Sequence, residues 1–261
     1  MEDFYIVDLT PENISEYGVC GYKDTAKHKE LRDKIEWFRT FYEKGLRIKA
    51  LISESGGYQG MIEYLPGEYA HRPVEAGQYM FIHCIFVGFK KEYKGRGYAS
   101  RLIDICIQDA KDKGLKGVAV VTRKGPFMVG SEIFIKKGFR LADRAQPDFE
   151  LLVRKFDDGA KDPKFILDTS SLKDDHSGGL TIMRSVQCPY TNKNVSAIVE
   201  TAKREYGIRV HVVDMAGPEE TQRSPCAFGT FCIVHDGEII AHHPISNGRF
   251  QNIMKGRLGT K

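Results

Sequence analysis

The most constraining feature of this sequence is an apolar run that leads into a glycine-containing turn and then into an amphipathic segment. The run covers Tyr79 to Phe89 and suits a strand buried on both faces of a sheet. The turn is Lys94-Gly-Arg-Gly-Tyr-Ala99, after which apolar residues recur at helical spacing up to Ala110. Free backbone N–H groups converge where such a strand and helix meet, and glycine lets an anion approach the main chain. The segment therefore predicts a strand, loop and helix that hold a phosphate group. A dinucleotide site is less well supported, because G-x-G-x-x-G and its acidic partner are missing.

Segments with strand periodicity and segments with helical periodicity lie before and after this strand, turn and helix within the first 156 residues. Strands at both ends of the order favour a mixed α/β sheet of the α+β kind over a simple repeat of strand and helix. The expected strands lie at residues 4–7, 48–53, 58–64, 117–122, 139–142 and 149–154, and the other expected helices at 27–42 and 131–137.

Turn-forming and charged residues replace the apolar pattern between Asp157 and Gly179. We expect a linker there, residues 157–179, between a domain of residues 1–156 and a smaller domain of residues 180–261. The second domain has an order of its own: a strand at 180–184, a helix opened by Cys188-Pro-Tyr-Thr191, a strand at 208–213, hairpin strands at 230–234 and 238–242, and a last helix.

Composition restricts the class of protein and its partners. The net charge is +4 over 261 residues without a block of like charge, so a nucleic acid is not an expected partner. No stretch reaches the ~18 apolar residues of a membrane helix, and the start does not resemble a signal peptide, so we expect a cytoplasmic protein that does not bind membranes. The six cysteines form no C-x-x-C pair, and His235, His242 and His243 offer no third ligand on one strand face, so no metal is expected.

The turn and its surroundings resemble the GNAT acetyltransferase superfamily, whose signature is Arg or Gln, two residues, Gly, one residue, and Gly or Ala. Lys94 takes the first place conservatively, and Gly97 and Ala99 fit the others. The hairpin, the strand before the turn and the short helix ending in Lys137-Gly138-Phe139 also follow the family's order, so the resemblance covers residues 1–156. The alternative is a plain glycine turn before a helix.

This resemblance implies that acetyl-CoA separates two parallel strands and that an acetyl group passes to an amine. Its pyrophosphate would rest on the loop, and its pantetheine arm would meet backbone groups that follow the buried strand. The implied cofactor-binding residues are Val87, Gly88, Phe89, Lys94, Gly95, Arg96, Gly97, Tyr98, Ala99 and Ser100.

Two residues are candidates for the catalytic base. His83 falls where histone-type members of the family carry a glutamate, and its solution pKa of about 6.5 suits proton removal near neutrality. A buried histidine of the core is an equally open interpretation. Glu63 is the second candidate, although an exposed, salt-bridged glutamate is the simpler expectation for it. The family's usual tyrosine acid is replaced by Phe134 and its frequent asparagine by Phe127. Either the thiolate leaves unassisted, or water or Ser131 protonates it, or catalysis is weak.

The second domain resembles thioredoxin-like proteins, and its Cys-Pro-Tyr start resembles glutaredoxins. A thiol at a helix N-terminus has a lowered pKa, which makes Cys188 the first reactive thiol candidate and Cys226 a candidate resolving thiol. Thr191 replaces the second cysteine, and Gly229 stands at the expected cis-proline. A GNAT domain with this extension resembles proteins that carry a YoaP-like C-terminal domain.

Three functions remain open from the sequence. The first is an acetyl-CoA-dependent N-acetyltransferase acting on a small-molecule or protein amine, with a homodimer left open. The second is a CoA-binding or sensor protein with little turnover. The third is a thiol-dependent redox protein acting through Cys188. The sequence does not identify the acceptor, because variable loops form the pocket that binds it.

Overall fold

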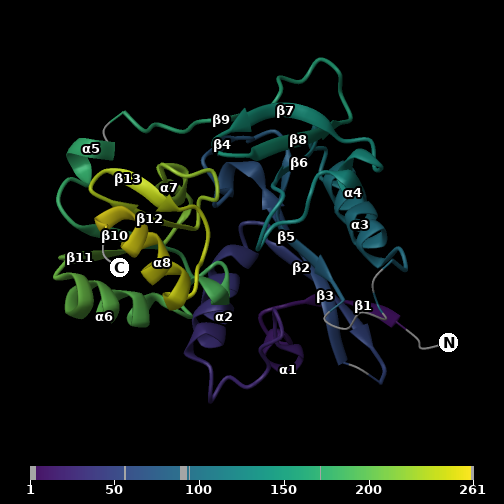
Figure 1. The fold of residues 1–261 in the computed structure, drawn as a ribbon. Coiled ribbons are helices and arrows are strands. Elements are labelled where there is room, and N and C mark those ends of the chain that lie inside the picture. The colour runs from purple at the N-terminus through teal and green to yellow at the C-terminus, as the bar shows by residue number, and fades with distance from the viewer. Residues whose placement is uncertain (1–3, 56, 89–92, 94, 171, 260–261) are drawn as a thin grey trace. The chain divides into compact units, whose positions relative to one another are not determined.

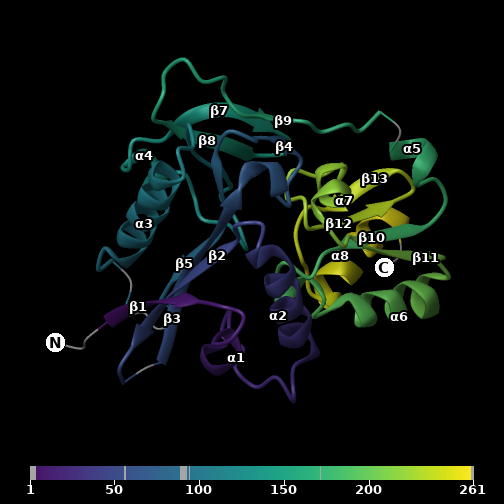
Figure 2. The ribbon, with the colours of Figure 1, turned by 180° about the vertical axis from the view of Figure 1, so that it is seen from behind.

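The structure is a computed structural model, and it describes residues 4–55, 57–88, 93, 95–170 and 172–259. The chain forms two compact units. The first contains residues 1–70 and 74–165, and the second contains residues 71–73 and 166–261. Figures 1 and 2 show both units from opposite sides.

A mixed seven-stranded sheet forms the centre of the first unit, in the order β1-β2-β3-β5-β6-β8-β7. Its neighbours β5 and β6 are parallel, and its other neighbours are antiparallel. This confirms the mixed α/β class predicted from the sequence. The strands are β1 (Phe4–Leu9), β2 (Arg47–Ser53), β3 (Gly57–Pro66), β5 (Met80–Val87), β6 (Gly117–Thr122), β7 (Arg140–Ala145) and β8 (Phe149–Lys155).

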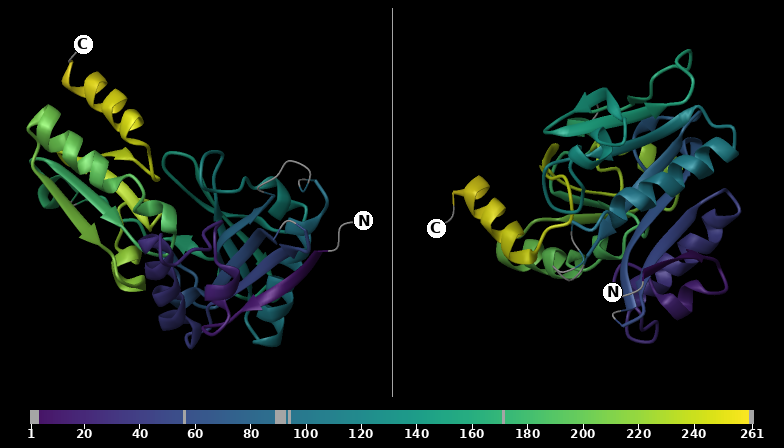
Figure 3. Two further views of the ribbon diagram at one scale, coloured as in Figure 1. Left: turned by 90° about the horizontal axis from the view of Figure 1, so that it is seen from below. Right: turned by 90° about the vertical axis from the view of Figure 1, so that its right-hand side faces the viewer.

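Helices cover both faces of this sheet (Figure 3). The helix α3 (Tyr98–Asp112) presents Leu102, Ile103 and Cys106 to a core that includes Ile62 and Ile82, and the short α4 (Glu132–Ile135) lies beside it. The helices α1 (Ile14–Tyr17) and α2 (Lys29–Tyr42) lie on the other face, and the 3-10 turn η1 (Gly67–Tyr69) follows β3. Burial of these apolar stripes holds the helices against the sheet.

The parallel strands β5 and β6 pair only at one end. Met80 to Ile82 lie opposite Val118 to Val120. Beyond these residues β5 continues to Val87 and β6 to Thr122, but the two strands no longer pair with each other. The register of β5 against β3 shifts at the same point, because Glu63 lies opposite Cys84 and Tyr64 lies opposite Ile82. His83 is thus the extra residue of a β-bulge, which bends β5 where it leaves β6.

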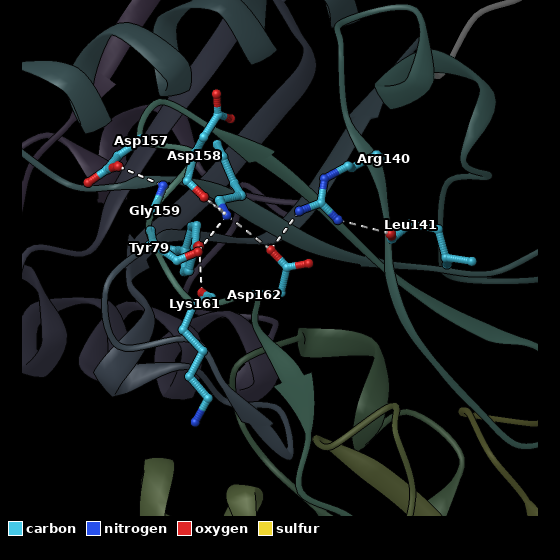
Figure 4. A network of polar contacts seen from close by, with 10 residues as sticks. Tyr79, Arg140, Leu141, Asp157, Asp158, Gly159, Lys161 and Asp162 are labelled. Atoms are coloured by element: carbon cyan, nitrogen blue, oxygen red, sulfur yellow. Dashed lines mark hydrogen bonds and ion pairs between the residues drawn. The ribbon is translucent and has the colours of Figure 1, made fainter.

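The beginning of the segment predicted as a linker is bound to the first unit (Figure 4). Tyr79 Oη donates to the backbone oxygen of Lys161 (2.7 Å), and Arg140 Nη2 donates to Asp162 Oδ1 (2.6 Å). Lys155 Nζ lies 3.4 Å from the same carboxylate oxygen of Asp162. The segment then forms β9 (Lys164–Phe165), which pairs with β4 (Val74–Glu75), and α5 (Leu172–Asp175).

The second unit contains a four-stranded sheet in the order β11-β10-β12-β13. Strand β10 (Leu180–Arg184) is parallel to β11 (Val210–Asp214) and antiparallel to β12 (Phe231–His235), which pairs with β13 (Glu238–Ala241). Its other elements are the 3-10 turn η3 (Pro189–Thr191) and the helices α6 (Val195–Tyr206), α7 (Pro218–Gln222) and α8 (Asn247–Leu258).

Residues 71–73 belong to this unit, and Arg72 Nη1 donates to Thr230 Oγ1 at 3.0 Å.

Among the described residues of the chain, no helix is both long and apolar enough to cross a bilayer.

Candidate functional site

A hollow of about 310 Å³ opens at the start of α3. Gly95 and Gly97 have φ angles of +76° and +80°, a left-handed conformation that favours glycine, and Gly97 is the N-cap of the helix. The hollow is lined by Ile85, Phe86, Val87, Tyr93, Gly95, Arg96, Gly97, Tyr98, Ala99, Ser100, Val129 and Ile133. The structure therefore brings seven of the predicted cofactor-binding residues together, while Phe89 and Lys94 lie outside the described residues.

The start of α3 gives this hollow a positive potential. The N–H of Arg101 donates to the oxygen of Gly97 at 3.0 Å, which is the first bond of the helix. The N–H groups before it have no acceptor within a helix, and the first turn of α3 contains no acidic residue. With the Arg96 guanidinium beside them, these groups suit an anion such as a pyrophosphate.

Gly88 occupies a different environment from the one expected. Its N–H donates to the oxygen of Gln59 at 2.8 Å, because the antiparallel register of β3 and β5 extends one residue beyond the pair of Gly60 and Val87. The expected N–H of Gly88 is thus already bonded in the sheet. Val87 lines the hollow, and it is the described residue of this segment that a ligand there would meet.

A second, smaller hollow of about 20 Å³ lies where β5 and β6 diverge. His83 and Cys84 line it from β5, Val121 from β6, and Phe127 from the loop that follows β6. The two hollows share Ile85 and Val129, so they are neighbours along the opening between the strands. A ligand arm that follows this opening would reach His83.

A buried cluster of charged and polar side chains lies behind His83. Lys34 Nζ of α2 donates to Glu63 Oε2 of β3, and both side chains are 0% exposed. His83 Nδ1 lies 3.4 Å from the other carboxylate oxygen, Oε1, and the His83 side chain is equally buried. Trp37 lies one helical turn after Lys34, and the Lys34 ammonium sits 4.0 Å from the centre of its ring. Three elements that are distant in sequence thus meet at the bulge of β5.

The Glu63 carboxylate is ionised in this cluster. Burial alone would raise its pKa, but the Lys34 charge and the contact with His83 outweigh burial and lower the pKa from 4.5 to about 2. The expectation of an exposed Glu63 is wrong, because the bulge and the facing helix α2 enclose its side chain. Lys34 was missed by the sequence analysis, although its place in the apolar stripe of Leu31, Ile35 and Phe38 was a signal.

Comparisons with known proteins assign two parts of the chain to families. Residues 12–126 match the model of the Acetyltransferase (GNAT) family. The chain carries a GNAT acetyltransferase domain. Residues 210–252 match the YoaP-like model, so a YoaP-like domain follows it. This pair of domains is the one that the sequence resemblance predicts.

Individual proteins are similar to this chain over most or part of its length. The protein described as the uncharacterized N-acetyltransferase YoaP of Bacillus subtilis (strain 168) is 29% identical over 253 residues, which cover 95% of this chain and 97% of that protein. Among solved structures, YhbS of Escherichia coli in complex with CoA has 14% identity and a TM-score of 0.40, covering 63% of this chain and 91% of that one. The acetyltransferase yncA of Salmonella typhimurium with acetyl-CoA has 12% identity and a TM-score of 0.43, covering 61% and 97%.

The GNAT domain lacks a proton donor at the place where the sequence analysis looked for one. Phe134 of α4 is fully buried, stacks edge-on against Phe139 at 5.4 Å and belongs to the core. Phe127 is 48% exposed beside the small hollow. Ser131 is the N-cap of α4 and lines a third hollow, next to the turn between β7 and β8.

In the YoaP-like domain, Cys188 is not the first residue of a long helix. It precedes the three-residue turn η3, and α6 begins only at Val195. The expectation that Cys188 caps the main helix is wrong, because Pro189 to Thr191 form a separate 3-10 turn, which has a far smaller dipole than a helix of several turns. Cys188 is half-buried and forms no disulfide.

Cys226 has a close imidazole neighbour. Its sulfur lies 3.3 Å from His242 Nδ1 and is buried. None of the six cysteines forms a disulfide, and Gly229 has a φ of +73° at the place where related folds are expected to carry a cis-proline. Among the described residues, no group of three or more His, Cys, Asp or Glu side chains is placed to hold a metal ion.

Proposed function

We propose that the GNAT domain binds acetyl-CoA along the opening between β5 and β6 and transfers its acetyl group to an amine, with His83 as the base. The divergence of β5 from β6 carries this proposal, since it joins the anion-binding start of α3 to the cluster of His83, Glu63 and Lys34. The hollow at α3 would hold the pyrophosphate of acetyl-CoA, and the small hollow would hold the thioester.

The reaction is a direct transfer. The amine nitrogen attacks the thioester carbon, a carbon–nitrogen bond forms and the carbon–sulfur bond breaks. His83 takes the proton that the amine loses, and the CoA thiolate takes a proton from water, because Phe134 has none to give and Ser131 lines another hollow.

The buried carboxylate supports His83 in this role. An ionised Glu63 beside Nδ1 favours the tautomer that has its proton on Nδ1 and stabilises the imidazolium that forms. Lys34 keeps Glu63 ionised by compensating its charge inside the protein. Glu63 and Lys34 are therefore positioning residues, and His83 is the group that meets the substrate.

The test is the release of CoA from acetyl-CoA by the full chain with a panel of amines. His83→Ala should lower kcat/KM by roughly 100-fold and remove the acidic limb of its pH profile. His235→Ala is a matched control, because His235 is also buried but lies in the YoaP-like domain. A His83→Ala enzyme that keeps both its rate and its pH profile would show that His83 is only a core residue.

The same assay separates the alternative function. The buried Phe134 favours a CoA-binding protein with little turnover, since the usual proton donor is missing. Tight CoA binding by calorimetry without CoA release for any amine in the panel would support that sensor role. CoA release that depends on His83 would support the transferase.

We further propose that residues 1–156 and 180–261 act as domains joined by residues 157–179 and that the second domain is thioredoxin-like. The sheet order β11-β10-β12-β13 and the sequence of strand, helix, strand, helix, two strands and helix support this fold. Limited proteolysis should cut first between residues 166 and 179, since residues 157–162 are bound to the sheet of the first unit.

A further inference from the structure

A third hollow in the first unit is lined by an arginine with one buried nitrogen that has no hydrogen-bond partner among the described residues. It has a volume of about 500 Å³ and lies between the end of β6, the start of α4 and the turn that joins β7 to β8. Its charged lining residues are Arg123, Lys124, Arg144, Asp148 and Glu150. This size is typical of a site for a small molecule.

The Arg123 guanidinium contacts two neighbouring side chains, but one of its nitrogen atoms has no hydrogen-bond partner among the described residues. Its Nε donates to Asp148 Oδ1 at 2.6 Å, and its guanidinium lies 4.9 Å from the centre of the Phe149 ring. Its side chain is only 14% exposed. The Nη1 atom is buried and has no hydrogen-bond partner among the described residues. A buried charged donor without an acceptor is costly, so an acceptor that enters the hollow would bind favourably.

We propose that Arg123 binds the carboxylate of the acceptor, so that the acetylated amine belongs to a small molecule that also carries a carboxylate, such as an α-amino acid. This inference rests on the proposed acetyl transfer. With Nε engaged by Asp148, the two Nη atoms remain to donate to an incoming oxygen, and a planar guanidinium matches the geometry of a carboxylate.

The charges of the hollow favour a single negative charge over a phosphate. Three cationic side chains face two carboxylates, and Arg144 lies 3.6 Å from Glu150 Oε1. The excess is one positive charge, which balances one carboxylate, whereas a dianion would meet repulsion from Asp148 and Glu150.

The hollow is connected to the proposed reaction by one loop. Residues 123–131 supply Arg123 and Ser131 to this hollow, Phe127 and Met128 to the small hollow beside His83, and Val129 to both that hollow and the one at α3. A molecule bound at Arg123 therefore lies along the same loop as the acetyl group.

The experiment compares amino acids with the amines that remain after loss of their carboxylate, for example phenylalanine with phenethylamine. The wild-type chain should prefer the amino acid in kcat/KM, and Arg123→Met should reduce this preference by about 10- to 100-fold. Arg123→Lys keeps the charge without the planar fork and should restore part of the preference. Methionine preserves the packing on Phe149, and the ratio of two substrates is insensitive to partial unfolding.

Two controls separate the possible sources of an effect. Arg39→Met removes an exposed arginine of α2 that lies outside all three hollows and should leave the ratio unchanged. CoA and 3′-dephospho-CoA are titrated into wild type and Arg123→Met by calorimetry. A loss of affinity for CoA alone would mean that the phosphate of CoA occupies the site, and the proposal would be overturned.

Different results would overturn the carboxylate site and the proposed acetyl transfer. Turnover of both members of each pair at equal rates would overturn the carboxylate site and leave the transferase intact. If no amine is acetylated, calorimetry with N-acetylphenylalanine and its amide decides: binding of the acid that depends on Arg123 supports the site without the transferase, and equal or absent binding overturns it.

Discussion

Both units place a turn and a helix directly after a central strand, but only one of them leaves room between its parallel strands. In the first unit, β5 pairs with β6 over Met80 to Ile82 and then diverges from it. In the second unit, β10 pairs with β11 along its whole length, from Leu180 to Arg184. A closed pair of strands has no gap for a ligand arm, so the divergence of β5 from β6 distinguishes the proposed cofactor site from the similar order of elements in the second unit.

The turns that follow β5 and β10 also differ between the two units. The turn before α3 contains two glycines with positive φ and leads straight into the helix, whereas the turn after β10 contains Cys188 and a separate 3-10 turn. Behind the diverging strand lie the charges of Lys34 and Glu63. Within the closed sheet, the Cys232 thiol instead lies 3.6 Å from the sulfur of Met183.

The largest effect is expected from Lys34→Met, which leaves Glu63 buried without its cation. Removal of one partner of a buried ion pair costs about 3 to 5 kcal/mol of the free energy of unfolding. Trp37 is the single tryptophan of the chain and lies on the Lys34 ammonium, so its fluorescence reports unfolding of the first unit in urea. Lys29→Met on the same helix removes an exposed ion pair with Asp33 and should cost about 0.5 kcal/mol or less.

The same cluster predicts how the stability of the first unit changes with pH. The pKa of Glu63 is about 2 in the folded chain and near its ordinary value of 4.5 when unfolded. Its contribution to the free energy of unfolding is therefore complete above about pH 4.5 and is lost as the pH falls toward 2. In Glu63→Gln, the urea midpoint from Trp37 fluorescence should fall less steeply across this range than in wild type. Parallel slopes for both chains would show that the ion pair does not form.

A loss of about 100-fold in CoA affinity is expected from Gly97→Asp, measured by calorimetry. The substitution places a negative charge at the start of α3 and an L side chain at a φ of +80°. Gly114→Asp is its matched control, because Gly114 also has a positive φ and an open surrounding but lies at the other end of α3. Equal affinities for CoA in the two variants would place the pyrophosphate elsewhere.

The smallest effect is expected in cysteine labelling. Cys84 and Cys188 are half-buried and the other four cysteines are buried, so iodoacetamide should modify these two first. Cys84 lines the small hollow between the diverging strands, so CoA at ten times its Kd should slow its labelling about tenfold. Cys188 should label at the same rate with and without CoA. Protection of Cys188 instead would assign the ligand to the second unit.

The sequence by itself determined the features that depend on neighbouring residues. The strand, the glycine turn and the helix around Gly97 are local, because positive φ angles and apolar periodicity are properties of a short stretch of chain. The anion-binding hollow follows from them, since backbone groups of one turn build it.

Tertiary structure alone decided which side chains meet across the sheet. Glu63 is buried and ionised because a one-residue bulge at His83 and a lysine from α2 enclose it, and neither register nor a partner 29 residues away is encoded in a local pattern. The same holds for Arg123, whose unsatisfied nitrogen depends on how the turn between β7 and β8 folds against the end of β6. Local geometry thus fixes the proposed anion site, whereas long-range packing fixes the groups that we propose to act on the acetyl group and its acceptor.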